Sequence, residues 1–345
     1  MASSNTFPYL EVAGDARTRG HLYGTAFRER IRATWRYYAE TIFATSKLSL
    51  AQITQRAARI RELIGDFNAE YCTEIEAIAQ ASGLAESEVY ALNARTEILN
   101  AAVGECTAVY LPTSRVLGQT WDWLAALEDL VAITKFSRPD GHRFVTLAEP
   151  GQLAKIGLNS AGLGVCLNFL VAPHALEGVP VHVLIRALLD CTDLAQARCT
   201  LARAGHGKAS HFLVADDQGS ALSYEFAGSY SGEVEPTAGI YAHTNHCIAA
   251  NCDERGYRIP TSVERLDAAR TQAAITCGTG LDHMKQILDF DDGTSRAIRV
   301  RYRPEPLLGG GEVGSCATLI MELSARVLHV KKGPSSAQPY TSIAV

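Results

Sequence analysis

The pattern of the chain changes sharply near Gly104, and this change limits the folds that it can form. Before it, apolar residues recur at steps of three and four over residues 15–46, 50–82 and 87–99, which predicts helices. After it, short runs rich in Val, Thr, Tyr and Leu alternate with Gly, Asn and Asp, which predicts strands joined by turns. This order predicts an α+β protein whose helices pack outside largely antiparallel sheets.

The individual segments can be placed by the same patterns. Strands are expected at residues 7–13, 107–111, 131–136, 144–147, 155–158, 163–170, 211–215, 221–226, 239–243, 317–322 and 327–331. Further helices are expected at residues 180–204, 261–275 and 280–289.

Composition excludes several classes of protein. The 345 residues carry a formal net charge of −5, with 47% hydrophobic and 20% charged residues, which is typical of a globular protein and not of a disordered or fibrous one. The mild negative charge argues against a nucleic-acid partner. The longest apolar runs fall short of the roughly 18 residues that a membrane span needs, so no membrane partner is expected.

Neither end of the given sequence shows a recognisable targeting signal. The first residues lack a basic segment followed by an apolar one, and the last residues, Ser-Ile-Ala-Val, are not a peroxisomal Ser-Lys-Leu signal. We therefore expect a cytoplasmic protein.

The nine cysteines are odd in number, scattered, and form no Cys-x-x-Cys pair. This usage predicts a reducing compartment without disulfide staples, and no structural zinc. The nearest metal-like group is His243, His246, Cys247 and Cys252. Because it follows an expected strand end, packed or hydrogen-bonded side chains are favoured over a metal site. No metal and no organic cofactor are expected.

Cys106 lies at the boundary between the helical and the β-rich segments, within Gly104-Glu105-Cys106-Thr107. Alone, a cysteine at a strand start is best interpreted as a small buried hydrophobe. Its surroundings change that interpretation, because four further motifs accompany it in order: Ala94-Arg95-Thr96-Glu97, Gly118-Gln119-Thr120-Trp121-Asp122, Gly157-Leu158-Asn159-Ser160-Ala161-Gly162 and His243-Thr244-Asn245-His246-Cys247.

This ordered set resembles the isopenicillin N acyltransferase family, also called acyl-coenzyme A:6-aminopenicillanate acyltransferases, which are N-terminal nucleophile hydrolases. The resemblance extends from Arg19-Gly20 and Tyr23-Gly24 to Ala317-Thr318-Leu319-Ile320, and residues 157–169 are also similar to the choloylglycine hydrolases. It implies a four-layer αββα sandwich and a precursor that cuts itself before its nucleophile.

The resemblance places this cut between Glu105 and Cys106. The products are a helical light chain of residues 1–105 and a β-rich heavy chain of residues 106–345, which together form one folded domain as a heterodimer of fragments. Glu105 departs from the family, which commonly has a small residue there. A carboxylate at this position could slow the cleavage.

The chemistry needs a thiolate, whereas an unperturbed cysteine with a pKa near 8.5 is mostly protonated at neutral pH. A freed α-amine on Cys106, with a reference pKa of about 7.7–8.0, can act as the base, so no catalytic histidine is required. By resemblance, Asp122 holds the amine and the thiol in place, and Asn245 donates to the oxyanion. Asn168 matches a second asparagine of the site, with a strand-end turn residue as an equally open interpretation.

Other residues have alternatives that the sequence leaves open. Tyr110, Trp121, Trp123, His243 and His246 are candidates for a substrate pocket, and core packing explains them equally well. Arg95 and Glu97 are interpreted as structural or processing contacts.

Two positions depart from the relatives. Gln119 stands where choloylglycine hydrolases have an arginine. Ser315-Cys316 stands where the isopenicillin N acyltransferases are expected to have another arginine. Direct electrostatic tuning of the thiol by an arginine at residue 119 is therefore missing, and substrate handling is expected to differ.

These observations predict a self-processing, cysteine-dependent acyltransferase or amidohydrolase that forms or cleaves an amide bond of a small molecule through an acyl-enzyme on Cys106. The expected substrates are an acyl donor, acyl-coenzyme A among the options, and an amine or water as acceptor. Hydrolysis and transfer use the same residues, so both remain open, as does a place in specialised metabolism. The alternative is a catalytically silent binding protein of the same fold.

Overall fold

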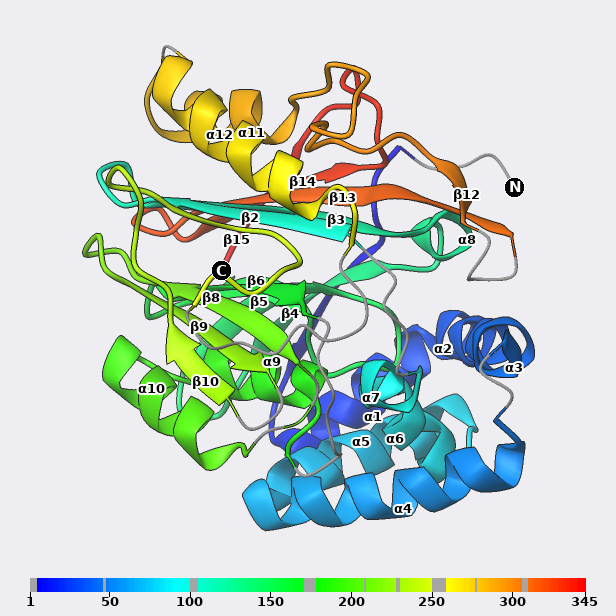
Figure 1. Ribbon diagram of the computed structural model, residues 1–345. Coiled ribbons are helices and arrows are strands. Elements are labelled where there is room, and N and C mark those ends of the chain that lie inside the picture. The colour runs from blue at the N-terminus through cyan, green and yellow to red at the C-terminus, as the bar shows by residue number, and fades with distance from the viewer. Residues whose placement is uncertain are drawn as a thin grey trace.

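The computed structural model describes residues 5–45, 48–99, 105–170, 178–205, 207, 209–227, 230–249, 259–276, 278–305 and 310–345. Two β-sheets lie face to face, with helices on both outer sides (Figure 1). The predicted α+β class and αββα layering are confirmed.

The first sheet has eight strands. Its spatial order is β1 (Tyr9–Ala13), β4 (Ala132–Ser137), β5 (Arg143–Ala148), β6 (Ile156–Asn159), β7 (Gly164–Phe169), β8 (Ser210–Ala215), β9 (Ala221–Ala227) and β10 (Tyr230–Glu233). Every neighbouring pair is antiparallel except β1 and β4.

The second sheet carries the Cys106 motif in its interior. Its order is β11 (Tyr241–His243), β2 (Glu105–Leu111), β3 (Val116–Leu124), β13 (Gly311–Glu322), β14 (Val327–Lys332) and β15 (Thr341–Ala344), with β12 (Arg303–Glu305) paired to β13. One apolar cluster joins the sheets, with Leu117 and Leu319 from the second and Leu158 and Val165 from the first.

Helices form the outer layers of the sandwich. Those packed below the first sheet in Figure 1 are α1 (Ala16–Ala26), α2 (Arg28–Tyr37), α3 (Phe43–Thr45), α4 (Leu50–Phe67), α5 (Ala69–Ser82), α6 (Glu86–Asn93), α7 (Arg95–Leu99), α9 (Val181–Leu189) and α10 (Leu194–Arg203). The second sheet is covered by α11 (Ser262–Ile275) and α12 (Gly280–Leu288). A π-helical turn at Tyr38–Ile42 and the short α8 (Ala125–Glu128) complete the set of named helices.

The expected long helices are interrupted by capping residues. The helix expected at 50–82 is split because Asn68 adopts an extended backbone and its side chain accepts a hydrogen bond from the Glu70 N–H, starting α5. Asp193 likewise accepts from the Gln196 N–H and starts α10 within the helix expected at 180–204. Strands β3, β10, β12 and β15 were not predicted, and β3 contains the Gly118–Asp122 motif.

Two further expectations can be compared with the structure. None of the helices in the described part of the chain is long and apolar enough to cross a membrane. The expectation of a chain without disulfides is wrong at one position, because Cys247 is disulfide-bonded.

Helices α1 and α5 approach closely at a glycine. A Cβ atom on Gly20 would lie 2.4 Å from the Glu74 carbonyl oxygen and 2.9 Å from the Ala77 Cβ, so the packing depends on the missing side chain. In contrast, a Cβ on Gly65 of α4 meets nothing closer than 3.7 Å.

We expect Gly20→Ala to lower the free energy of unfolding by about 1–3 kcal/mol, because the helices must move apart. Gly65→Ala is the matched control and should raise it by about 0.5–1 kcal/mol, since alanine favours a helix more than glycine. Urea unfolding followed by circular dichroism measures both. Equal effects of the two changes would contradict the close approach.

Candidate active site

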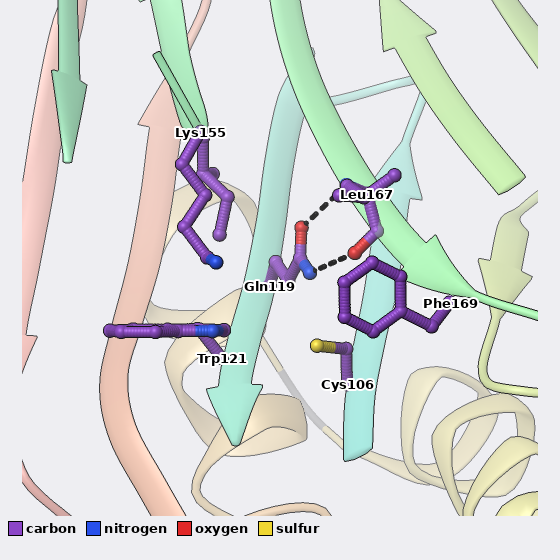
Figure 2. A pocket seen from close by; sticks show the side chains of 7 residues that line it. Cys106, Gln119, Trp121, Lys155, Leu167 and Phe169 are labelled. Carbon is purple, nitrogen blue, oxygen red and sulfur yellow. Dashed lines mark hydrogen bonds between the residues drawn. The ribbon is translucent and has the colours of Figure 1, made fainter. Parts of the chain in front are cut away.

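Cys106 is the second residue of β2 and lies between β11 and β3. Side chains alternate along a strand, so Cys106 and its neighbours Glu105 and Thr107 point to opposite faces of the sheet. The thiol faces the other sheet, where it lines a pocket with Leu167 and Phe169 of β7 (Figure 2). Thr107 and Glu105 face α11, because Arg265 and Thr261 hydrogen-bond to their side chains.

Both backbone polar groups of Cys106 are held by buried side chains. Its N–H donates to Asn245 Oδ1 at 2.9 Å. Its carbonyl oxygen accepts from Arg265 Nη1 at 2.9 Å and from Asn168 Nδ2 at 3.1 Å. Arg265 also donates to Asn245 Oδ1 at 2.8 Å, so one guanidinium ties the strand to the asparagine. The structure thus brings Cys106, Asn168 and Asn245 together.

The two asparagines are themselves oriented by a second set of contacts. Asn245 Nδ2 donates to the Phe169 carbonyl oxygen at 3.1 Å. Asn168 Oδ1 is 3.0 Å from His211 Nδ1, and the His211 ring stacks on His243 with 3.6 Å between centroids. Burial holds the pKa of His211 well below its usual value, so its neutral ring donates to Asn168 through Nδ1.

Asp122, on β3, lies directly opposite Glu105 of β2 and is almost fully buried. A shift in strand register between Ser315 and Ala317 places Ser315 opposite Asp122, and Ser315 Oγ donates to Asp122 Oδ1 at 2.6 Å. Asp122 Oδ2 has no hydrogen-bond partner among the described residues. Burial raises the pKa of Asp122 to about 8, against the opposing pull of Arg265.

The thiol of Cys106 is held in its protonated form in this uncut chain. Burial raises its pKa to about 11, and the nearby Asp122 carboxyl acts in the same direction. Hydrogen bonds from the Asp122 backbone and the Gln119 side chain, and the positive charge of Lys155, oppose the rise. The Gln119 amide is fixed by Leu167, to which it donates at 2.5 Å and from which it accepts at 3.0 Å.

The pocket beside the thiol is narrow. Its lining residues are Cys106, Gln119, Trp121, Lys155, Ile156, Leu167 and Phe169 (Figure 2). Its volume of about 10 Å³ is at the lower limit for one water molecule, so an acyl chain needs more room than this pocket gives. Burial lowers the pKa of Lys155 to about 8, and its ammonium lies 4.5 Å from the centre of the Trp121 ring.

A buried charge network lies behind this pocket. Glu149 accepts from Arg95 Nη2 at 2.7 Å and from Lys155 Nζ at 3.0 Å. These two cations hold the pKa of Glu149 well below its usual range despite burial. The Arg95 guanidinium also lies over the Trp123 ring, 4.7 Å from its centre. The network therefore links α7, which begins at Arg95, to β3 and to the segment between β5 and β6 that contains Glu149 and Lys155.

Of the five residues predicted as a substrate pocket, Trp121 lines the pocket beside the thiol. Tyr110 instead donates to the Asp216 carbonyl oxygen, and Trp123 donates to the Tyr38 hydroxyl. His243 Nε2 lies 2.7 Å from Glu225 Oε1, and His246 Nδ1 lies 2.7 Å from Ser262 Oγ. Glu97 accepts from the Val181 N–H at 2.8 Å, a structural contact.

Glu105 carries a carboxylate that is bound on the α11 side of the sheet. Its Oε1 accepts from Thr261 Oγ1 at 2.8 Å and from Arg303 Nη2 at 2.8 Å, and its Oε2 lies 4.0 Å from Arg265 Nε. Within the described ranges, no group of three His, Cys, Asp or Glu side chains is arranged to hold a metal ion.

Comparison with known proteins gives the family. The sequence model described as acyl-coenzyme A:6-aminopenicillanic acid acyl-transferase matches residues 111–303, which include Asp122, Asn168 and Asn245 and begin five residues after Cys106. The acyl-coenzyme A:6-aminopenicillanic-acid-acyltransferase 40 kDa form of Emericella nidulans is 30% identical over 249 residues, 70% of this chain and 69% of the relative.

The chain belongs to the acyl-coenzyme A:6-aminopenicillanic acid acyltransferase family. Solved structures of lower similarity include the Caenorhabditis elegans ortholog of N-acylethanolamine-hydrolyzing acid amidase, with a TM-score of 0.45 and 13% identity over 70% of this chain and 99% of that one. A C2A mutant of conjugated bile acid hydrolase from Clostridium perfringens has a TM-score of 0.43 and 10% identity, over 70% of this chain and 92% of that one.

Sequence reasoning for this acyltransferase-family chain missed three residues of the site. Arg265 lies in the middle of α11 with no motif around it, and Lys155 stands outside the Gly157–Gly162 motif. Ser315 was noted as a departure, but its bond to Asp122 depends on the register shift in β13. A buried cation next to an apolar strand is the signal that could have singled out Lys155.

We expect Arg95→Met to lower the free energy of unfolding by about 3–5 kcal/mol, because Glu149 loses a buried partner and is left undercompensated. Arg61→Met is the control: it removes an ion pair to Glu76 from a side chain that is 55% exposed, and should cost less than about 1 kcal/mol. Urea unfolding measures both. Similar costs for the two changes would refute the structural importance of the buried pair.

Proposed function

We propose that this chain is a self-processing cysteine amidohydrolase or acyltransferase whose nucleophile is Cys106. The proposal is supported above all by the contacts of Cys106: Asn245 binds its N–H, Arg265 and Asn168 bind its carbonyl, and its thiol faces the pocket. Such backbone contacts hold the Glu105–Cys106 peptide bond still beside the thiol, and preorganisation of this kind lowers the barrier to attack.

In the processing step, Cys106 Sγ attacks the carbonyl carbon of Glu105. The bond from this carbon to Cys106 N breaks and a thioester to Sγ forms, while the thiol proton passes to the departing nitrogen. Water then hydrolyses the thioester. The products are a light chain of residues 1–105 and a heavy chain of residues 106–345 with a free α-amine on Cys106.

The new α-amine takes over as base for turnover, since its reference pKa of about 7.7–8.0 suits neutral pH. Asp122 Oδ2 is buried and without a partner among the described residues, which supports the proposal that it accepts a hydrogen bond from this amine after cleavage. Cys106 forms the acyl-enzyme from an amide or thioester donor, and an amine or water accepts the acyl group. An aminopenicillanic acid, as in the name of the Emericella relative, is one such amine.

The asparagines are proposed to stabilise the oxyanion. Loss of one such donor costs about 3–4 kcal/mol of transition-state stabilisation. Asn245 Nδ2 is engaged by the Phe169 carbonyl in the uncut chain, so it must exchange this bond to serve the oxyanion. Asn168 Nδ2 already points to the backbone of Cys106.

The second candidate is a silent binding protein of the same fold. Two observations favour it: the raised pKa of the Cys106 thiol and the carboxylate of Glu105 fixed by Arg303. The first leaves little thiolate for attack, and the second opposes departure of the cut end. A cytoplasmic location and a role in specialised metabolism stay predictions.

Intact mass and N-terminal sequencing under denaturing conditions separate the two candidates. The wild type should give two fragments, one beginning at Cys106, and Cys106→Ala should give one uncut chain of 37.2 kDa without activity. Cys166→Ala is the matched control, since Cys166 is a buried free thiol on the neighbouring β7, and it should be cut like the wild type. An uncut wild type, or a cut Cys106→Ala chain, is incompatible with the proposal.

The raised thiol pKa predicts how processing depends on pH. With a pKa of about 11, the thiolate is a small fraction at neutral pH and grows about tenfold with each pH unit, so the processing rate should rise about 100-fold from pH 7 to pH 9. Chain synthesised in vitro at pH 6 and shifted to higher pH gives the rate on a gel. Asp122→Asn should keep the slope, because the thiol remains buried; a flat profile in the wild type excludes the thiol as the titrating group.

A further inference from the structure

Glu105 is the acyl group of the chain's own first reaction. In self-processing, the carbonyl of Glu105 moves from the nitrogen of Cys106 to its sulfur. A substrate acyl group occupies the same bond to Sγ during turnover. The groups that bind the Glu105 side chain therefore lie where the side chain of a substrate acyl group begins, if the proposed function holds.

These groups form a binding site for a carboxylate. Glu105 Oε1 accepts hydrogen bonds from Thr261 at the start of α11 and from Arg303 on β12, each at 2.8 Å. The Arg265 Nε atom lies 4.0 Å from Glu105 Oε2. Among the described residues, Glu105 is the carboxylate that pairs with Arg303. Once the light chain ends at Glu105 and this end moves away, Arg303 keeps its charge without that partner.

The free space near the scissile bond lies on this side too. A cleft of about 260 Å³ is lined by Glu105, Thr261, Thr294, Arg301, Tyr302 and Arg303. The apolar pocket at the thiol holds about 10 Å³. Asp291 in the cleft is already paired with Arg299 and Arg301, whereas Arg303 is paired with Glu105 at 2.8 Å.

We propose that Arg303 and Thr261, with Arg265 behind them, form the acyl-side subsite of the processed enzyme, and that it selects acyl groups carrying a carboxylate at the position of the Glu105 side chain. A glutaryl group has this spacing, with its carboxylate three methylenes from the reacting carbonyl. This inference rests on the proposed function and names its substrate class. The reaction is unchanged: Sγ displaces the amine, and water or a second amine takes the acyl group from the thioester.

The test uses enzyme whose complete processing has been checked by intact mass. Its substrates are glutaryl p-nitroanilide and the neutral counterpart in which an amide replaces the free carboxylate. We expect kcat/KM for the glutaryl compound to exceed that for the neutral one by about 10- to 100-fold, the range for charge-assisted hydrogen bonds. Succinyl and adipyl anilides, one methylene shorter and longer, should fall below the glutaryl compound.

Variants assign the preference to the subsite. Arg303→Gln should bring the ratio of the two kcat/KM values close to one, and Arg303→Lys should restore part of it. Arg296→Gln is the control, because Arg296 is an exposed arginine nearby that pairs with Asp267, and it should keep the wild-type ratio. Processed Glu105→Ala enzyme, whose light chain ends without a competing side-chain carboxylate, should show at least the wild-type preference.

The outcomes separate this inference from the proposed function. Processed enzyme that treats both anilides alike, prefers the neutral one or releases no nitroaniline from the glutaryl compound overturns the subsite and leaves self-processing standing. A chain that stays uncut and inert toward both overturns the proposed function and the subsite with it.

Discussion

The pairing of β2 with β3 is the constraint on which the site depends. Its register sets Cys106 across from Trp121 and Glu105 across from Asp122. Because side chains alternate, the thiol enters the space between the sheets while both carboxyls face α11. A shift of one residue would exchange these faces and leave Arg265 beside a thiol instead of the backbone of Cys106. Strand register therefore decides which groups can react.

Burial then sets the electrostatics of each face. On the thiol side, Arg95, Lys155 and Glu149 form a closed network, and the excess cation opposes the rise in the pKa of Cys106 without cancelling it. On the other side, burial raises the pKa of Asp122, and Ser315 is the donor that the described residues offer to this carboxyl. The proposed cleavage would put a new ammonium on Cys106 and so add a positive charge beside Asp122, which would couple cleavage to the charge balance of the site.

Apolar periodicity predicted the helical first segment, most strands and the α+β class, because it is a local signal, whereas the αββα layering was predicted from the family resemblance. Periodicity missed the break at Asn68, where one side-chain cap outweighs a continuous apolar pattern. Motif order singled out Cys106, Asp122 and both asparagines, and the structure places the asparagines against the backbone of Cys106 and Asp122 on the paired strand β3. Their roles in catalysis stay predictions. Arg265 and the Ser315 contact were not predictable, since they arise from helix docking and from an irregular register between distant strands.

Under the proposed function, Glu105 bears on two reactions, the cleavage of the chain and the turnover of substrate. A small residue before Cys106 would leave Arg303 without the carboxylate to which it is paired. Glu105 instead gives Arg303 and Thr261 a partner, and the ion pair orders the strand end at which the thiol must attack. In the proposed processing step, the same contacts would hold the carbonyl carbon of Glu105 still, which favours attack, and would oppose departure of the product, which slows release. The balance of these two effects decides whether a carboxylate at this position hinders self-processing or guides it.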